Sequence, residues 1–113
     1  MHELPVTEDI LRIVAAHAQQ AGATRVTRIN LVIGELTSFI DDSIQFYFEM
    51  LSPGTPAEGA TLHFTRIKTR FRCRRCAQEF EPEGRNWTCP ACGALGGDVI
   101  AGKEFYVESI EVT

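Results

Sequence analysis

The sequence of 113 residues has room for one domain, or for one domain with a small appendage. Hydrophobic residues make up 44% and charged residues 23%, which are globular values and exclude a disordered chain. The formal net charge of −4 disfavours general nucleic-acid binding through bulk charge. No apolar run is long enough to span a membrane and no secretory signal pattern stands at the start, so we expect a cytoplasmic protein.

Hydrophobic periodicity predicts a helix and then a strand in the first third of the chain. Residues 7–21 place their apolar side chains on one helical face, and Gly22 supplies a C-terminal stop. Residues 25–33 alternate so that Ile29, Leu31 and Ile33 share one face, which predicts a strand that ends at the following glycine.

A second helix is predicted to begin at Asp41 or Asp42, either of which can serve as its N-cap. Its buried stripe follows i, i+3, i+4, i+7 spacing and comprises Ile44, Tyr47, Phe48 and Leu51. Prolines and glycines make residues 52–59 a loop. The alternating patterns of residues 61–71 and 103–112 predict two further strands.

The cysteines lie in a segment that interrupts this small sheet. Basic residues fill the stretch from Arg66 to Cys76 and acidic ones dominate afterwards, which suggests a boundary near Phe71. We therefore expect an α/β domain made of residues 1–71 with 101–113, and an inserted module made of residues 72–100. The fold class is α+β, with a small sheet of about three strands, two helices packed on it, and the cysteine module as an insert whose ends lie close together.

The four cysteines have the spacing of a zinc site, because Cys73-x2-Cys76 and Cys89-x2-Cys92 are separated by twelve residues. Each CxxC turn directs two thiolates toward one point, so two turns supply the ligands of a closed tetrahedral site. Gly93 is expected to permit close backbone approach after the second pair. Because every position is taken by cysteine, a structural zinc is favoured over a catalytic one. Two disulfides or an iron–sulfur cluster are the alternatives.

The N-terminus offers a second set of metal donors. Met1 carries an α-amine, and His2 adds an amide and an imidazole nitrogen, so adjacent chelate rings can form. Glu3 adds a further donor through its amide or its carboxylate. Nitrogen donors in a plane suit Ni(II) or Cu(II) better than zinc. Alone, such a terminus is weak evidence for a metal site, since most chain ends bind nothing important.

Three motifs, MHELPVTEDIL at the start, IGEL at Ile33 to Leu36 and the late double CxxC, together resemble the HypA/HybF family of hydrogenase nickel-incorporation metallochaperones. The resemblance covers essentially the whole 113 residues in order and in length. It rests on the combination of MHE with the double CxxC, because neither motif alone is specific.

The resemblance implies a nickel-binding α/β domain and a zinc ribbon inserted before the last strand. It assigns nickel binding to Met1, His2 and Glu3, and zinc binding to the four cysteines. It also implies transfer of nickel to the large subunit precursor of [NiFe]-hydrogenase together with the GTPase HypB, and in some organisms a role in urease maturation. Nucleic acid and membranes are not expected partners. A homodimer stays open, because strands that flank an insert invite domain swapping.

Two other classes of function are alternatives. A zinc-ribbon adaptor that binds nucleic acid or protein is supported by the cysteine module and the Arg66–Arg75 stretch, but the net charge of −4 opposes nucleic acid. An enzyme is not expected, because no nucleophile–base pattern or phosphate loop accompanies Glu35, Asp41 and Asp42. The aspartates are interpreted as helix caps, and Glu35 as a strand-end residue that supports the site or contacts a partner.

Overall fold

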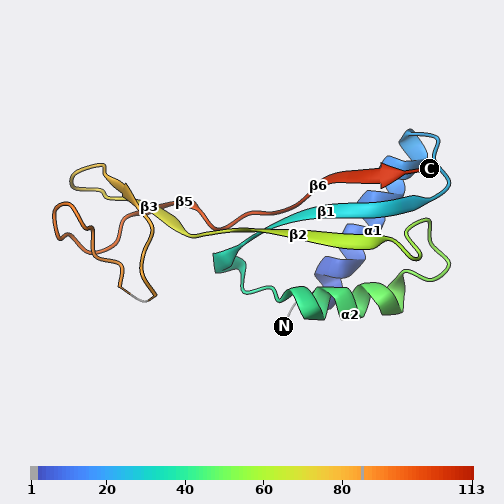
Figure 1. The fold of residues 1–113 in the computed structure, drawn as a ribbon, viewed down its shortest axis with the longest axis horizontal. Helices are drawn as coiled ribbons and strands as arrows, with labels where there is room; N and C mark the ends of the chain where they lie inside the picture. The colour runs from blue at the N-terminus through green and yellow to red at the C-terminus, as the bar shows by residue number, and fades with distance from the viewer. Residues whose placement is uncertain (1–2, 85) are drawn as a thin grey trace. The chain divides into compact units, whose positions relative to one another are not determined.

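The structure is a computed structural model that describes residues 3–84 and 86–113, so Met1 and His2 of the expected nickel site lie outside the described residues. The described elements follow the chain in the order α1 (Glu3–Gln20), β1 (Val26–Gly34), the 3-10 turn η1 (Glu35–Thr37), α2 (Asp41–Leu51), β2 (Thr61–Ile67), β3 (Arg70–Arg72), β4 (Glu79–Phe80), β5 (Asp98–Ala101) and β6 (Phe105–Val112) (Figure 1). Two α-helices and two small sheets confirm the predicted α+β class in this part of the chain.

The described residues form two compact units. Unit 1 comprises the residues up to Val32 together with Ser38–Thr65 and Tyr106–Thr113, and unit 2 comprises Ile33–Thr37 and Arg66–Phe105. Unit 1 contains α1 and α2, whereas unit 2 contains all four cysteines. Glu3 and the cysteines therefore belong to different units.

The core of unit 1 lies between the two helices and the sheet. The three strands have the order β2-β1-β6, so β1 is central, and α1 packs against α2. Val14, Ile29, Leu31 and Ile44 are completely buried, as the periodicity predicts. Each such side chain contributes roughly 1.5–3 kcal/mol through removal of its apolar surface from water. Of the predicted α2 stripe, Tyr47 and Leu51 are only half-buried.

Helix α1 begins four residues before the predicted start at residue 7. The Thr7 hydroxyl is buried and donates to the Glu3 carbonyl at 2.6 Å, so Thr7 lies inside the helix. Pro5 fits the first turn because no intrahelical partner is required for its nitrogen there. The predicted stop is confirmed: Gly22 has φ +67°, and the Ala23 N–H donates to the Ala18 carbonyl at 2.9 Å.

The predicted aspartate cap of α2 is wrong. Ile40 occupies the N-cap position in extended conformation, and its side chain makes no capping hydrogen bond. Asp41 and Asp42 instead lie in the first helical turn, where their carboxylates face the positive end of the helix dipole. The aspartates therefore stabilise the helix start through charge, one and two positions after the N-cap.

Unit 2 is organised around β3, which pairs antiparallel with both β4 and β5. The strand predicted over residues 61–71 is in fact two strands, because β2 ends at Ile67 and β3 begins at Arg70. Phe71 faces Phe80 in β4 and Val99 in β5. Arg72 pairs with Asp98, which brings the two ends of the cysteine segment together as expected.

Gly34 is a position where a side chain has no room. A Cβ atom built there would overlap the backbone carbonyl of Gly102, while the Gly34 N–H donates to the Glu104 carbonyl at 2.6 Å. We expect Gly34→Ala to lower the free energy of unfolding by about 3 kcal/mol, since backbone cannot move aside as a flexible side chain would. Differential scanning calorimetry measures this loss. Gly22→Asn is the control, because nothing lies within 4 Å of its Cβ position and Asn tolerates positive φ. Equal melting temperatures for both variants would contradict the steric explanation.

Candidate metal centres

The four cysteine sulfurs of unit 2 converge on one point. Cys73, Cys76, Cys89 and Cys92 have sulfur atoms that all lie within 4.8 Å of one another. The Cys73–Cys92 and Cys76–Cys89 separations are 3.5 and 3.6 Å. A tetrahedral zinc ion with Zn–S bonds of about 2.3 Å needs sulfurs about 3.8 Å apart. The donor set and its spacing therefore fit a single tetrahedral ion, whereas a disulfide needs sulfurs about 2.05 Å apart.

Both CxxC pairs form the same turn. The Ala77 N–H donates to the Cys73 carbonyl and the Gly93 N–H to the Cys89 carbonyl, each at 2.9 Å. The residue after each pair adopts positive φ, +65° at Ala77 and +78° at Gly93. The predicted reason for Gly93 is wrong: its Cβ position meets nothing within 4 Å, so the left-handed backbone, and not a close approach, favours glycine.

Ala77 is the strained member of this pair of turns. An L-residue in the left-handed region costs roughly 1–2 kcal/mol. Glycine avoids this cost, but it loses more conformational entropy on folding, which offsets part of the gain. We therefore expect Ala77→Gly to raise the free energy of unfolding of the zinc-loaded protein by about 0.5–1 kcal/mol. Chemical denaturation measures this gain, with Ala91→Gly, inside the second CxxC, as the comparison. A loss of stability in Ala77→Gly would show that the turn gains nothing from glycine.

The thiols of Cys73 and Cys76 have pKa values shifted in opposite directions. Backbone N–H groups of Cys76 and Arg75 lower the pKa of Cys73 to about 6, and the Arg75 N–H lies 3.4 Å from its sulfur. The Gln78 N–H lowers the pKa of Cys76, but desolvation and the neighbouring cysteines outweigh it and raise that pKa to about 12. A first thiolate therefore forms readily above about pH 6, whereas four thiolates together need a cation to offset their repulsion.

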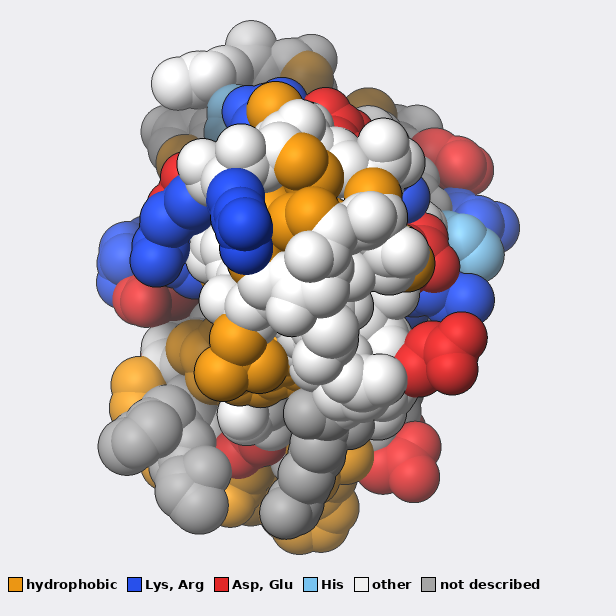
Figure 2. All heavy atoms as spheres, turned by 90° about the vertical axis from the view of Figure 1, so that its left-hand side faces the viewer, with side chains coloured by type: hydrophobic (Ala, Val, Ile, Leu, Met, Phe, Trp, Pro, Cys, Tyr) orange, Lys and Arg blue, Asp and Glu red, His pale blue; other side chains and the backbone are white. Residues whose placement is uncertain are grey.

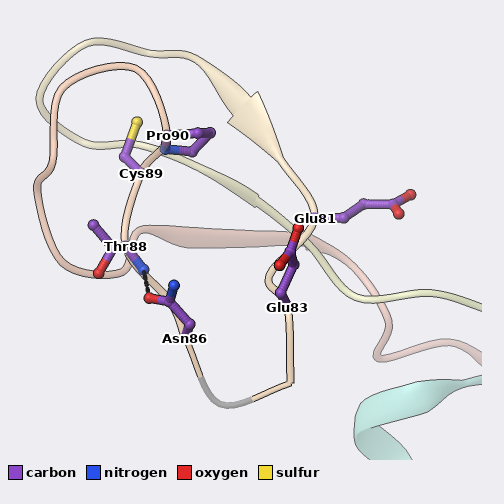
Figure 3. A pocket seen from close by; sticks show the side chains of 6 residues that line it. All are labelled: Glu81, Glu83, Asn86, Thr88, Cys89 and Pro90. Carbon is purple, nitrogen blue, oxygen red and sulfur yellow. Dashed lines mark hydrogen bonds between the residues drawn. The ribbon is translucent and has the colours of Figure 1, made fainter.

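A pocket of about 270 Å³ lies beside Cys89 and is lined by Glu81, Glu83, Asn86, Thr88, Cys89 and Pro90. Figure 3 shows the Glu81 carboxylate pointing away from the Cys89 sulfur, and Asn86 accepting from the Thr88 N–H. Within residues 3–84 and 86–113, the cysteines form the one group whose donor atoms converge for a metal. The acidic side chains of the pocket add no ligand to that group.

Glu3 is the one predicted nickel ligand that the structure describes. It is buried, and its Oε2 accepts from the Ile40 N–H at 3.3 Å. Its own backbone N–H, together with that of Ile40, lowers the pKa of the Glu3 carboxyl, so the group is ionised at neutral pH. No local sequence pattern predicts the contact with Ile40, because the two residues lie 37 positions apart in the chain.

Glu35 in the IGEL motif has a structural partner within unit 2. Its Oε1 accepts from the Thr69 hydroxyl at 2.8 Å and lies 3.4 Å from the Thr69 N–H. Thr69 is buried, so this carboxylate satisfies polar groups that water does not reach. Ile33 is also fully buried, and Gly34 allows the close approach described above. Burial, close packing and hydrogen bonding therefore explain three successive residues of the motif, Ile33, Gly34 and Glu35.

Three arginines of the basic stretch that supported a nucleic-acid adaptor form ion pairs with acidic side chains. Arg70 pairs with Glu79 and Glu81, Arg72 with Glu79, and Arg74 with Asp98 at 2.9 Å. Figure 2 shows acidic side chains beside some of the Lys and Arg side chains on the face that it views. Paired arginines are poorly placed to neutralise phosphates, so the structure does not favour the adaptor.

The fold and the cysteine centre define a small α+β protein with a metal-binding module. A family model described as HypA, hydrogenase/urease nickel incorporation, metallochaperone, matches residues 1–112. The hydrogenase maturation factor HypA of Dehalococcoides mccartyi strain CBDB1 is 50% identical over 99% of this chain and 94% of its own length. That of Caldanaerobacter subterraneus is 42% identical over 99% of both chains.

Two solved structures share the fold. The solution structure of a HypA protein superposes with a TM-score of 0.76 at 23% identity, over 100% of this chain and 97% of that one. The Ni metallochaperone HypA from Helicobacter pylori gives 0.68 at 23% identity, over 99% and 97%.

The chain belongs to the HypA family of hydrogenase/urease nickel-incorporation metallochaperones. It is accordingly a maturation factor and not an enzyme. Among the described residues, no helix has the length and apolar character that crossing a membrane requires.

Proposed function

We propose that this protein carries Ni(II) on its N-terminal residues and delivers it for the maturation of [NiFe]-hydrogenase, while a zinc ion at the four cysteines holds unit 2 together. The observation that carries the proposal is the family match over residues 1–112, combined with the convergence of the four sulfurs. In this account the nickel-binding domain is residues 1–71 with 101–113, and the zinc ribbon is residues 72–100.

In this proposal zinc stays bound at the four cysteines, and its role is structural. Cys73, Cys76, Cys89 and Cys92 occupy all four positions of a tetrahedral shell, which leaves none for a substrate. The strands β3, β4 and β5 of unit 2 contain only two to four residues each. Metal binding energy therefore supplies much of the folding energy of this unit.

Nickel is the cargo, held by Met1, His2 and Glu3. A carrier needs a site that a partner can reach, and a chain terminus with few protein ligands meets that need better than a closed cage. Amine, amide and imidazole nitrogens suit Ni(II) in a planar arrangement. The Glu3 carboxylate is ionised and anchored by the Ile40 N–H, which supports its use as a further donor at a fixed place.

The partners in this account are the GTPase HypB and the precursor of the hydrogenase large subunit, with the cytoplasm as the place of transfer. Because the family description includes urease, urease maturation proteins are a second destination for the nickel.

A metal titration tests the proposal. The zinc-loaded protein, prepared with Met1 as its first residue and no tag before it, is titrated with Ni(II) by calorimetry. Metal content is then measured by mass spectrometry. We expect one bound nickel and one retained zinc per chain. Displacement of zinc by nickel, or the absence of saturable nickel binding, would contradict the two-site account.

A further inference from the structure

One face of α2 carries large apolar side chains in solvent. Phe46 is 63% exposed and Met50 is 54% exposed, and their i, i+4 spacing places them next to each other on the helix. The Phe46 ring packs edge-on against Tyr47 with 5.3 Å between ring centroids. Large side chains such as Phe and Met are typical of the centre of a protein interface.

Carboxylates border these two side chains. Asp42 lies one turn before Phe46, and Glu49 lies beside Met50, both exposed. Glu49 accepts from the neutral Gln45 amide at 2.8 Å, which leaves its charge uncancelled. In the part of the chain that the structure describes, neither Asp42 nor Glu49 forms an ion pair, and α2 contains no Lys or Arg.

The charge of this face decides between classes of partner. An anionic lipid surface or a nucleic acid is repelled by uncancelled carboxylates, whereas a protein segment with Lys or Arg around an apolar stripe is complementary. Because a helix has no free strand edge, an extended peptide cannot bind to α2 by adding a strand. The binding mode that suits α2 is the packing of a second helix against its ridges. In Figure 1, α2 lies below the strands of unit 1.

We propose that the α2 face, defined as Asp42, Phe46, Glu49 and Met50, docks a cationic amphipathic helix of a partner protein. Phe46 and Met50 bury against the apolar stripe of that helix, and the two carboxylates pair with its basic residues. This surface is distinct from the metal ligands and does not require nickel.

The position of the face connects it with the cargo. Ile40, at the N-cap of α2, donates its N–H to the Glu3 carboxylate at 3.3 Å. Phe46 follows six residues later, which is about 9 Å along a helix axis. A partner docked on α2 is therefore held within reach of Glu3. This last step rests on the proposed nickel site, whereas docking itself does not.

The test uses a labelled Leu/Lys peptide that forms about four turns of amphipathic helix, with a Leu/Glu peptide of the same pattern as its counterpart. Binding to the zinc-loaded full-length protein is followed by fluorescence anisotropy and by amide NMR shifts, first without nickel and then with it. We expect saturable binding of the Leu/Lys peptide alone, with shifts concentrated in α2. Phe46→Ser with Met50→Ser weakens binding by about tenfold or more, and Asp42→Asn with Glu49→Gln by about threefold.

Matched controls separate docking from bulk charge. Ile13→Ser removes another exposed apolar side chain, and Glu8→Gln with Glu108→Gln removes two other exposed carboxylates, so neither is expected to change binding. Equal weakening by either control would overturn the proposal. A dimer of the free protein that Phe46→Ser disrupts would also overturn it, because the occupant would then be a second copy. Peptide binding without nickel, followed by failure of nickel binding, would leave docking intact and contradict only the nickel site.

Discussion

Cys89→Ser is expected to abolish stoichiometric zinc binding and to unfold unit 2 while unit 1 keeps its helices. Cys89 is 1% exposed and packs with Phe71, Cys73 and Phe80, so it is both a metal donor and a core residue. Structural zinc sites contribute an apparent binding energy of about 10–16 kcal/mol at neutral pH. The short strands of unit 2 have no comparable source of stability once that energy is lost.

Trp87 makes this outcome measurable. It is the only tryptophan in the chain and packs edge-on against Phe71, with 5.5 Å between ring centroids. Its fluorescence should shift toward that of a solvated indole in Cys89→Ser, while far-ultraviolet circular dichroism retains the helical signal. Thr88→Ser is the neighbouring control and should keep both zinc and the native emission. Native emission in a zinc-free Cys89→Ser protein would show that unit 2 folds without the ion.

Nickel binding is expected to depend on the α-amine and on His2. His2→Ala removes the imidazole, and a Gly-Ser extension before Met1 leaves every residue in place but removes the amine from the site. Each change should weaken nickel binding by about a hundredfold or more, since loss of an outer contact alone costs about ten- to a hundredfold. Calorimetry on zinc-loaded protein measures the affinities.

The other two histidines provide the controls for this prediction. His17→Ala and His63→Ala should bind nickel like the unaltered protein, because neither belongs to the proposed donor set. Zinc content should be the same in all variants. Nickel binding that survives the extension but falls in His17→Ala or His63→Ala would place the nickel site elsewhere in unit 1.

Local sequence patterns correctly predicted the features of the fold that depend only on residues close together in the chain. Alternation placed Ile29 and Leu31 in the core, and helical spacing did the same for Ile44 and Phe48, all of which are buried. The CxxC spacing predicted the convergence of four sulfurs, because each turn fixes its own two donors. These features need only a few residues of context, which is why the sequence was informative about them.

Contacts between distant residues were not predictable. The Glu3–Ile40 and Glu35–Thr69 hydrogen bonds join residues 37 and 34 positions apart, and no local pattern marks either. The division of the predicted strand 61–71 also depends on its partners, because β2 pairs with β1 whereas β3 pairs with β4 and β5. The half-exposed Tyr47 and the exposed Phe46 show that a helical pattern does not say which residues a second layer covers.

Delivery is the central claim, and transfer of radioactive nickel tests it most directly. Zinc-loaded protein carrying one ⁶³Ni per chain is mixed with the apo precursor of a hydrogenase large subunit, with HypB and GTP, and the proteins are then separated. We predict that nickel appears in the precursor faster than from free nickel buffered to the same activity, and that the extended N-terminal variant gives no such acceleration. Transfer at the same rate with and without the protein would contradict the account.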